Sequence, residues 1–233
     1  MPLRADLAGR LVRRYKRFLA DVETADGRIL TVHCPNPGSM LGCAREGASV
    51  RCSTSDDPRR KLRHTLEMIR LGRAWVGLHT LRANQLVRLA LEAGAIRELR
   101  GYRRIRPEVS VAGSRLDFHL EEHARDPRPA WLEVKSVTLA RGDRAEFPDS
   151  VTERGRRHTE TLLRLRRRGQ RAVLLFVVQR ADCRSVAPAD DLDPAYGAAL
   201  RRAAQAGVEV RAVRARVSPR GIQLDGALPV QLS

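Results

Sequence analysis

The segment Trp131-Leu132-Glu133-Val134-Lys135 carries the pattern that decides how this chain folds. As a β-strand with a two-residue period, it places Glu133 and Lys135 on one face and its apolar residues on the other. Asp117 lies on the preceding strand candidate, inside Ser114-Arg115-Leu116-Asp117-Phe118. Pairing of the two strands would therefore bring two carboxylates together beside Lys135.

Two carboxylates and a lysine at one edge of a sheet predict a site for Mg²⁺ or Mn²⁺ that keeps water molecules and accepts a substrate phosphate. The metal would stabilise charge on the phosphate and acidify a bound water, while Lys135 would orient that water or help to deprotonate it. A Glu-x-Lys triplet also arises by chance as a surface ion pair of little energetic consequence. The carboxylate of Asp117 on the preceding strand favours the catalytic interpretation.

Lysine is rare in this chain, since only three of its 44 basic residues are lysines: Lys16, Lys61 and Lys135. A retained lysine indicates a position that needs a compact ammonium group whose pKa can shift, a property that arginine lacks. The formal net charge is +17. Because the basic residues are spread along the chain, a positive folded surface that attracts nucleic acid, DNA or else RNA, is expected. A GC-rich genome, which inflates arginine, is the alternative explanation of this charge.

Cysteine usage and hydropathy exclude several classes of protein. The four cysteines form no Cys-x-x-Cys pair, so reduced thiols are expected and neither a zinc knuckle nor a disulfide-rich secreted scaffold is indicated. Basic residues interrupt every apolar stretch of residues 1–20, so no signal peptide is expected. No segment reaches the ~18 apolar residues of a membrane span. We therefore expect a soluble, cytoplasmic protein without a membrane partner.

Residues 1–80 have the pattern of a small all-β domain. Short strands are predicted at residues 10–14, 18–23, 28–33 and 49–54, with an Asp26-Gly27 hairpin turn. Residues 34–40 cannot continue a strand, because they contain two prolines and a glycine. Five or so short strands with a basic face fit an OB-like barrel, a common platform for single-stranded nucleic acid.

Residues 81–233 have a different pattern, so we predict a domain boundary at about residue 80. A helix is expected from there to Gly94, which suits a helix C-terminus. Strands are predicted at 104–111, 115–120, 130–137, 172–178 and 208–213, and helices at 150–168 and 194–206. Asp149 or Ser150 is the expected N-cap of the first of these helices. The order α-β-β-β-α-β-α-β predicts a mixed sheet covered by helices.

Several motifs along the chain resemble one known family. They are Tyr15-Lys16-Arg17-Phe18-Leu19-Ala20, His33-Cys34-Pro35-Asn36, Ser114-Arg115-Leu116-Asp117-Phe118, Glu133-Val134-Lys135-Ser136-Val137-Thr138, and Phe147-Pro148-Asp149 through Val151-Thr152-Glu153-Arg154-Gly155. They are similar, in order, to motifs of the bacterial sugar fermentation stimulation protein A (SfsA) family. The resemblance implies an N-terminal OB-like small β-barrel, then a PD-(D/E)XK nuclease-like mixed α/β domain, with DNA binding and a link to sugar metabolism. Asp117, Glu133 and Lys135 fall on the nuclease motif.

The resemblance also suggests further site residues. Glu108 would add a metal ligand through the water shell, although a strand glutamate more often faces solvent. Arg154 and His158 are four residues apart and share a helix face, which would present both to substrate phosphate unless this is an ordinary basic surface helix. Asn84 would supply a polar group near the metal, or be a helix-surface amide, and Asn36 would contact the ligand or simply shape its loop. The expected nucleic-acid contacts are Arg115, Arg154, His158, Asn84 and Asn36.

Three functions are compatible with the sequence. The first is a metal-dependent nuclease that binds DNA, or else RNA, with weak sequence specificity, because charge is abundant while aromatic residues make up only 4% of the chain. The second is a non-catalytic DNA-binding regulator of sugar-utilisation genes. The third is an RNA-binding β-barrel with a passive partner domain, which predicts that residues 1–80 alone keep the full affinity.

Overall fold

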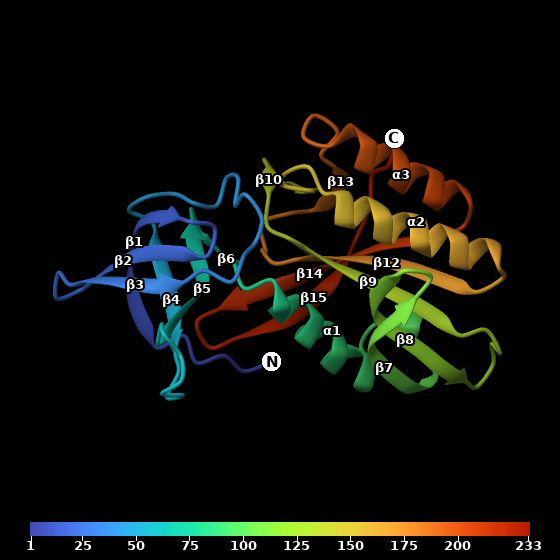
Figure 1. Ribbon diagram of the computed structural model, residues 1–233, viewed down its shortest axis with the longest axis horizontal. Helices are drawn as coiled ribbons and strands as arrows, with labels where there is room; N and C mark the ends of the chain where they lie inside the picture. Colours follow the sequence, from blue (N-terminus) through green and yellow to red (C-terminus); the bar gives the residue numbers. More distant parts are fainter.

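The first part of the molecule is a closed β-barrel. A computed structural model describes residues 1–233, and its first six strands are β1 (Leu7–Tyr15), β2 (Leu19–Thr24), β3 (Ile29–His33), β4 (Ser49–Thr54), β5 (His64–Leu71) and β6 (Ala74–Gly77). They form one sheet in the order β3-β2-β1-β4-β5-β6 (Figure 1). A parallel pairing of β3 with β5, at His33 and Thr65, closes five of these strands into the expected OB-like barrel.

Three of the four cysteines lie in the apolar core of this barrel: Cys34, Cys43 and Cys52. Burial raises the pKa of Cys43 to about 11 and the pKa of Cys52 to about 12. These thiols therefore stay protonated and pack as small apolar side chains. All four cysteines are free and buried, as the absence of a paired spacing indicated.

The second part of the molecule is a mixed α/β domain. Its elements are α1 (Leu81–Glu92), a 3₁₀ turn η1 (Arg97–Leu99), β7 (Tyr102–Val111), β8 (Ser114–His123), β9 (Ala130–Val137), β10 (Ala140–Arg141), β11 (Arg144–Phe147), α2 (Glu153–Arg167), β12 (Arg171–Val178), β13 (Ser185–Pro188), α3 (Pro194–Gln205), β14 (Glu209–Ser218) and β15 (Gly221–Leu228). Six strands form a sheet in the order β15-β14-β12-β9-β8-β7, and β10, β11 and β13 form a small second sheet. The apolar strand β12 runs parallel to both β9 and β14, which is typical of a strand covered on both faces.

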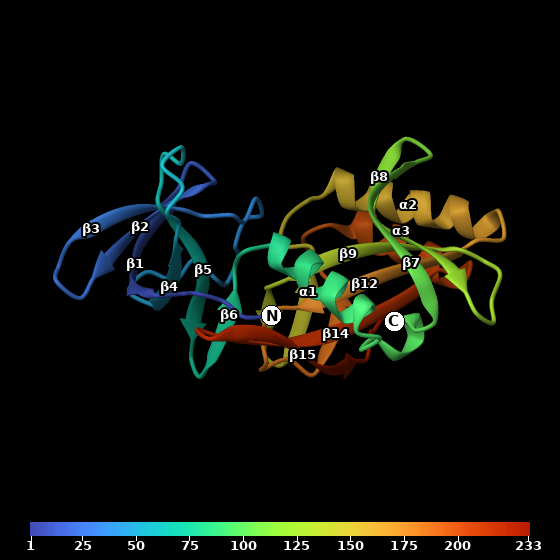
Figure 2. The same cartoon turned by 90° about the horizontal axis from the view of Figure 1, so that it is seen from below.

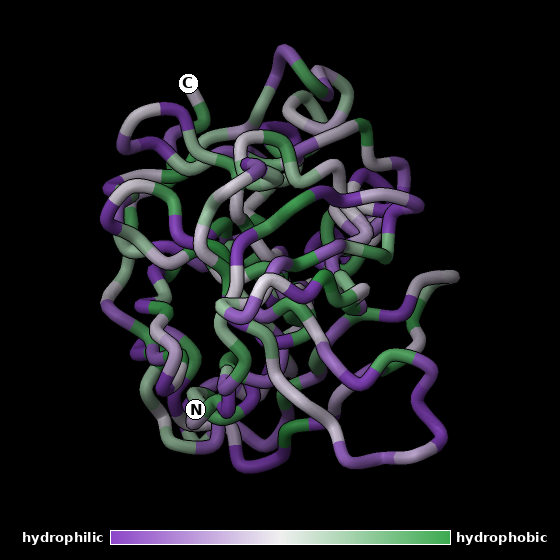
Figure 3. The backbone as a smooth tube through the Cα atoms, turned by 90° about the vertical axis from the view of Figure 1, so that its left-hand side faces the viewer, coloured by the Kyte–Doolittle hydropathy of each residue, from purple (hydrophilic) through white to green (hydrophobic).

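Helices cover both faces of the six-stranded sheet. Helix α1 packs against one face, where it contacts β9 and β15, and α2 and α3 pack against the other (Figure 1 and Figure 2). In Figure 3, hydrophobic residues run through the middle of the molecule and most residues of its outer loops are hydrophilic. The predicted fold class, an OB-like barrel followed by a helix-covered mixed α/β domain, is confirmed. None of the helices has the length and apolar character that crossing a membrane requires.

Several observed strands were not among the predicted ones, including β5, which closes the barrel, and β6. Strand β15 was missed because its residues Ile222–Leu228 mix apolar with polar side chains and a glycine at the edge of the sheet, and β10, β11 and β13 have only two to four residues each. The expected N-cap of α2 was wrong. Thr152 caps this helix, since its Oγ1 accepts a hydrogen bond from the Gly155 N–H at 3.1 Å.

The first residues of the chain pack on the α/β domain rather than on the barrel. Pro2 pairs with Gly221, and the amino group of Met1 donates to the Ile222 carbonyl at 2.9 Å. Leu3 and Ala5 are buried in the core beneath α1, although a division at residue 80 groups them with the barrel. The chain therefore crosses between its two parts twice, which ties the barrel to the sheet.

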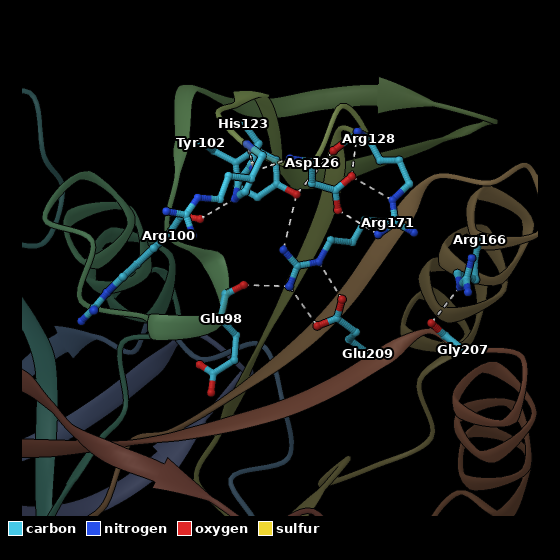
Figure 4. A network of polar contacts seen from close by, with 11 residues as sticks. Glu98, Arg100, Tyr102, His123, Asp126, Arg128, Arg166, Arg171, Gly207 and Glu209 are labelled. Carbon is cyan, nitrogen blue, oxygen red and sulfur yellow. Dashed lines mark hydrogen bonds and ion pairs between the residues drawn. The ribbon is translucent and has the colours of Figure 1, made fainter.

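A network of polar contacts joins the start of β12 to its neighbours (Figure 4). Arg171 donates to both carboxylate oxygens of Glu209, at 2.6 and 3.0 Å, and to the Glu98 carbonyl at 2.7 Å. Nearby, Arg128 forms an ion pair with Asp126 at 2.8 Å. Acidic partners neutralise arginines such as these, so the net charge of +17, which is the excess of basic over acidic residues, must come from the basic side chains that have no acidic partner.

Candidate active site

The candidate site forms where the backbone pairing of β8 and β9 stops. The last paired residues are Phe118 and Leu132. Beyond them, the Val134 N–H donates to Asp117 Oδ2 at 2.7 Å instead of to a backbone carbonyl. The Asp117 carboxylate thus takes the place of a backbone carbonyl of β8 as the acceptor for the buried Val134 N–H. The backbones of β8 and β9 are therefore no longer paired at the site.

Glu133 is the centre of the buried polar cluster. Its Oε1 accepts from Lys135 Nζ at 2.7 Å and from His158 Nδ1, on α2, at 2.5 Å. Its Oε2 is buried and has no hydrogen-bond partner. As predicted, Glu133 and Lys135 share one face of β9, while Leu132 and Val134 join the core on the α1 face.

Asp117 is held from two sides. Besides the Val134 N–H on Oδ2, the side-chain amide of Asn84 on α1 donates to Oδ1 at 2.6 Å. The structure therefore brings Asn84, which only the family resemblance suggested, to Asp117. Its amide orients Asp117 and lines the cleft in front of it.

The two carboxylates differ in electrostatic environment. Burial, followed by the neighbouring Glu133, raises the pKa of Asp117 to about 7. Burial alone would also raise the pKa of Glu133, but Lys135 and His158 together hold it below its usual range. Without a cation, Glu133 therefore carries the negative charge and Asp117 resists ionisation.

A cleft of about 490 Å³ opens in front of these residues, and both parts of the molecule line it. The α/β domain contributes the three motif residues, Asn84, and Arg154 from the first turn of α2. The barrel contributes Arg17 and the 36–38 segment of its proline-containing loop. The barrel loop thus forms one wall of the cleft.

Three predicted site residues do not line this cleft. Glu108 and Arg115 lie on the β7–β8 hairpin and pair with each other at 2.8 Å, both largely exposed, so each neutralises the other. His158 is 3% exposed, because the packing of α2 turns it towards Glu133 and away from Arg154, which does line the cleft. Presentation of both His158 and Arg154 to a substrate phosphate is therefore wrong, and His158 is a positioning residue for Glu133.

The loop carrying Asn36 is fixed by contacts that the sequence did not reveal. Asn36 Oδ1 accepts from the Gly38 N–H at 2.9 Å, which shapes the turn. Arg14 donates to the carbonyl oxygens of Asn36 and Gly38, at 3.0 and 2.7 Å. Across the cleft, the Met40 N–H donates to Asp149 Oδ2 at 2.9 Å. A side chain at Gly38 would meet that carboxylate, with its Cβ only 2.5 Å from Oδ2.

Comparison with known proteins agrees with the fold over nearly the whole chain. The family model "SfsA N-terminal OB domain" matches residues 12–78, and "Sugar fermentation stimulation protein RE domain" matches residues 81–221. The chain belongs to the sugar fermentation stimulation protein (SfsA) family. A sugar fermentation stimulation protein homolog of Halorhodospira halophila is 55% identical over 225 residues, covering 95% of this chain and 93% of that protein. A homolog from Geobacter sulfurreducens is 50% identical over 224 residues, covering 96% of this chain and 95% of that protein.

A solved SfsA structure has the same arrangement. Pyrococcus furiosus SfsA, in complex with Ca²⁺, superposes with a TM-score of 0.87 at 28% identity, covering 97% of this chain and 95% of that one. The family resemblance inferred from the motifs is therefore confirmed.

The residues of this SfsA family member fit a divalent cation. The buried Oε2 of Glu133 has no hydrogen-bond partner, and Asp117 stands close enough for the negative charge of Glu133 to disfavour its ionisation. A hard cation bound by both carboxylates would give Glu133 Oε2 a partner and would reduce the repulsion between Asp117 and Glu133. No three His, Cys, Asp or Glu side chains are arranged here so that they could hold a metal ion by themselves, so water and substrate phosphate would complete the shell, as suits Mg²⁺.

The raised pKa of Asp117 makes a prediction about stability without metal. Below the unfolded-state pKa near 4 the carboxyl is protonated in both states, and as pH rises towards 7 only the unfolded state ionises, so the folded state loses relative stability. Asp117→Asn removes this loss. In EDTA, urea unfolding measures the free energy of unfolding of Asp117→Asn relative to the parent. We expect this difference to shift in favour of the variant by roughly 2 to 3 kcal/mol as the pH rises from 5 to 8. Asp143→Asn, a surface carboxylate, is the matched control. A gain that is the same at both pH values would contradict the assignment.

Proposed function

We propose that this protein is a Mg²⁺- or Mn²⁺-dependent nuclease that hydrolyses phosphodiester bonds of DNA, with an OB-like domain at residues 1–80 and the catalytic domain at residues 81–233. The observation that carries this proposal is the buried cluster of Asp117, Glu133 and Lys135 at the floor of a cleft, with one Glu133 oxygen unpartnered. A surface ion pair would not be buried in this way, so the chance interpretation of the Glu-x-Lys triplet loses its support.

Each residue of the cluster has a role that follows from its contacts. Asp117 and Glu133 would hold the metal, which when bound supplies positive charge to the scissile phosphate and acidity to an attacking water. Asn84 and His158 keep the two carboxylates in place through the bonds at 2.6 and 2.5 Å. Lys135 is 2.7 Å from Glu133 Oε1, so its ammonium group stands at the carboxylate that would bind metal. There it can orient the attacking water and take part in moving its proton.

Cleavage assays test this proposal directly. Labelled DNA and RNA, single-stranded and duplex, are incubated with the protein and Mg²⁺, Mn²⁺ or EDTA. We expect cleavage of DNA with either metal and none with EDTA. Tight DNA binding with no cleavage under any of these conditions would favour the alternative, a non-catalytic DNA-binding regulator of sugar-utilisation genes. Full affinity in residues 1–80 alone would favour an RNA- or DNA-binding barrel with a passive partner domain.

DNA binding should depend steeply on salt. Unpaired arginines contact phosphates, and each contact releases counterions, so affinity should fall by about 10²-fold or more between 50 and 200 mM salt. Few aromatic residues are present to read bases, and the preference between unrelated sequences should be small. Fluorescence anisotropy with two unrelated oligonucleotides over this salt range measures both effects. A flat salt dependence, or a preference for one short sequence by orders of magnitude, would contradict the electrostatic account.

A further inference from the structure

We infer that the cleft takes an unpaired strand of DNA, as single-stranded DNA or a frayed duplex end, rather than an intact duplex. The inference rests on the proposed nuclease function and specifies its substrate. Four features of the cleft carry it: the depth of the carboxylates, a wall held in place by hydrogen bonds, an apolar rim, and two arginines without partners, one from each part of the molecule.

The carboxylates lie at the bottom of a confined space. Glu133 is 3% exposed and Lys135 9% exposed. The cleft in front of them measures about 490 Å³, within the ~300–1,000 Å³ of sites that enclose one small ligand. Such a space holds one or two nucleotides, whereas a duplex is stiff and does not bend into it without a large deformation cost.

The wall opposite β9 is fixed against widening. The Ser39 hydroxyl donates to the Asp149 carbonyl at 2.6 Å, and the Met40 N–H donates to the Asp149 carboxylate at 2.9 Å. At the start of α1, the Thr80 hydroxyl donates to the Pro35 carbonyl at 3.1 Å. The barrel loop therefore joins the α/β domain at two points, and a duplex cannot enter simply by displacing a free loop.

Two of the most exposed apolar side chains in the protein line this same cleft. Leu81, the first residue of α1, is 63% exposed, and Val151, before α2, is 72% exposed. Isolated exposed apolar residues are ordinary, but two from different elements at one opening form a surface suited to unstacked bases. In a duplex the base faces are stacked on each other, so only an unpaired strand offers them.

The cleft also provides two cationic side chains with no acidic partner. Arg154 on α2 and Arg17 on the β1–β2 turn both line it, and neither guanidinium makes a hydrogen bond or an ion pair in the structure. Arg17 follows Lys16 in a turn where both residues have positive φ, 67° and 45°. Glycine or asparagine usually occupies such positions, and strained backbone of this kind is retained mainly at functional sites. We assign Arg17 to a phosphate of the unpaired strand, next to the one bound at the carboxylates.

The experiment compares four DNA substrates of one sequence: a single strand, a blunt duplex, and duplexes with 3′ or 5′ overhangs. With Mg²⁺ we expect kcat/KM at least tenfold higher for the single strand and overhangs than for the blunt duplex. With Ca²⁺, as a probe of binding, anisotropy should show the same order of affinity. Arg17→Gln should weaken single-strand binding about tenfold and lower the slope of log affinity against log salt concentration by about one. The control Arg45→Gln, which changes an exposed barrel arginine outside the cleft, should leave both the affinity and the slope nearly unchanged.

The rim is tested by Leu81→Ala with Val151→Ala against Leu89→Ala, a leucine of the same helix that is 46% exposed and outside the cleft. The rim variant should reduce the preference for unpaired DNA severalfold, and the control should leave it unchanged. Equal or better binding and cleavage of the blunt duplex would overturn the inference. Absence of metal-dependent cleavage on every substrate would instead reject the nuclease function, while the Ca²⁺ binding series would still decide which strand state the cleft accepts.

Discussion

Lys135→Arg is expected to slow DNA cleavage by about 10² to 10⁴-fold while leaving DNA binding nearly unchanged. The Lys135 side chain is only 11% exposed and its ammonium group lies 2.7 Å from Glu133 Oε1. Arginine there is longer and planar, so its charge would be misplaced relative to the carboxylate. Its pKa is also too high for proton transfer. Single-turnover cleavage, with circular dichroism and metal titration to confirm folding and metal binding, measures the effect.

Lys61→Arg is the matched control for this substitution. Lys61 is exposed and lies outside the cleft, so the change should leave cleavage unaltered and shift stability by at most ~0.5 kcal/mol. If Lys135→Arg cleaved at the parent rate, Lys135 would have no part in the mechanism, and the retention of lysine there would be accidental.

The second large effect is expected from the double variant Asp117→Asn with Glu133→Gln. These changes remove both proposed ligand carboxylates with little change in shape, so calorimetry should show Mg²⁺ or Mn²⁺ binding lost and cleavage with it. DNA affinity in EDTA should stay the same or rise, because two negative charges no longer repel the phosphates. Glu133→Gln also leaves the buried ammonium of Lys135 with a weaker partner, so unfolding is measured alongside.

The control for the double variant neutralises an aspartate and a glutamate on the surface, Asp143→Asn with Glu160→Gln, which are 68% and 50% exposed. It changes the net charge equally but touches no residue of the cleft. Metal affinity that is unchanged in the cleft variant would place the metal site elsewhere. A loss of metal binding in both variants would indicate diffuse attraction instead of a site.

The core of the candidate site could be predicted because it depends on local geometry. The two-residue period of a strand places Glu133 and Lys135 on one face wherever that strand lies. Asp117 could be added because β8 and β9 are consecutive and pair antiparallel. Asn84 was predicted only from the family resemblance, since nothing local indicates that α1 points its amide at Asp117.

The predictions that failed depended on packing. Four-residue spacing places Arg154 and His158 on one side of α2, but that spacing does not say which side chain faces the sheet. In the fold, His158 turns inward to Glu133 and Arg154 reaches the cleft. Glu108 adopts a positive φ of 55° on β7 and pairs with Arg115, a contact between neighbouring strands that strand alternation does not predict.

By itself the sequence determined the barrel, the sheet-forming segments and the face of β9 that carries the chemistry, because each follows from periodicity within a few residues. Tertiary structure alone decided that residues 1–5 pack into the core between α1 and the sheet of the α/β domain. It also decided that Asp149 holds the barrel loop, 109 residues away in the chain, and that Arg17 and Arg154 line one cleft. Such contacts join segments far apart in the chain, and their energies depend on the packing of the whole molecule, so no local pattern encodes them.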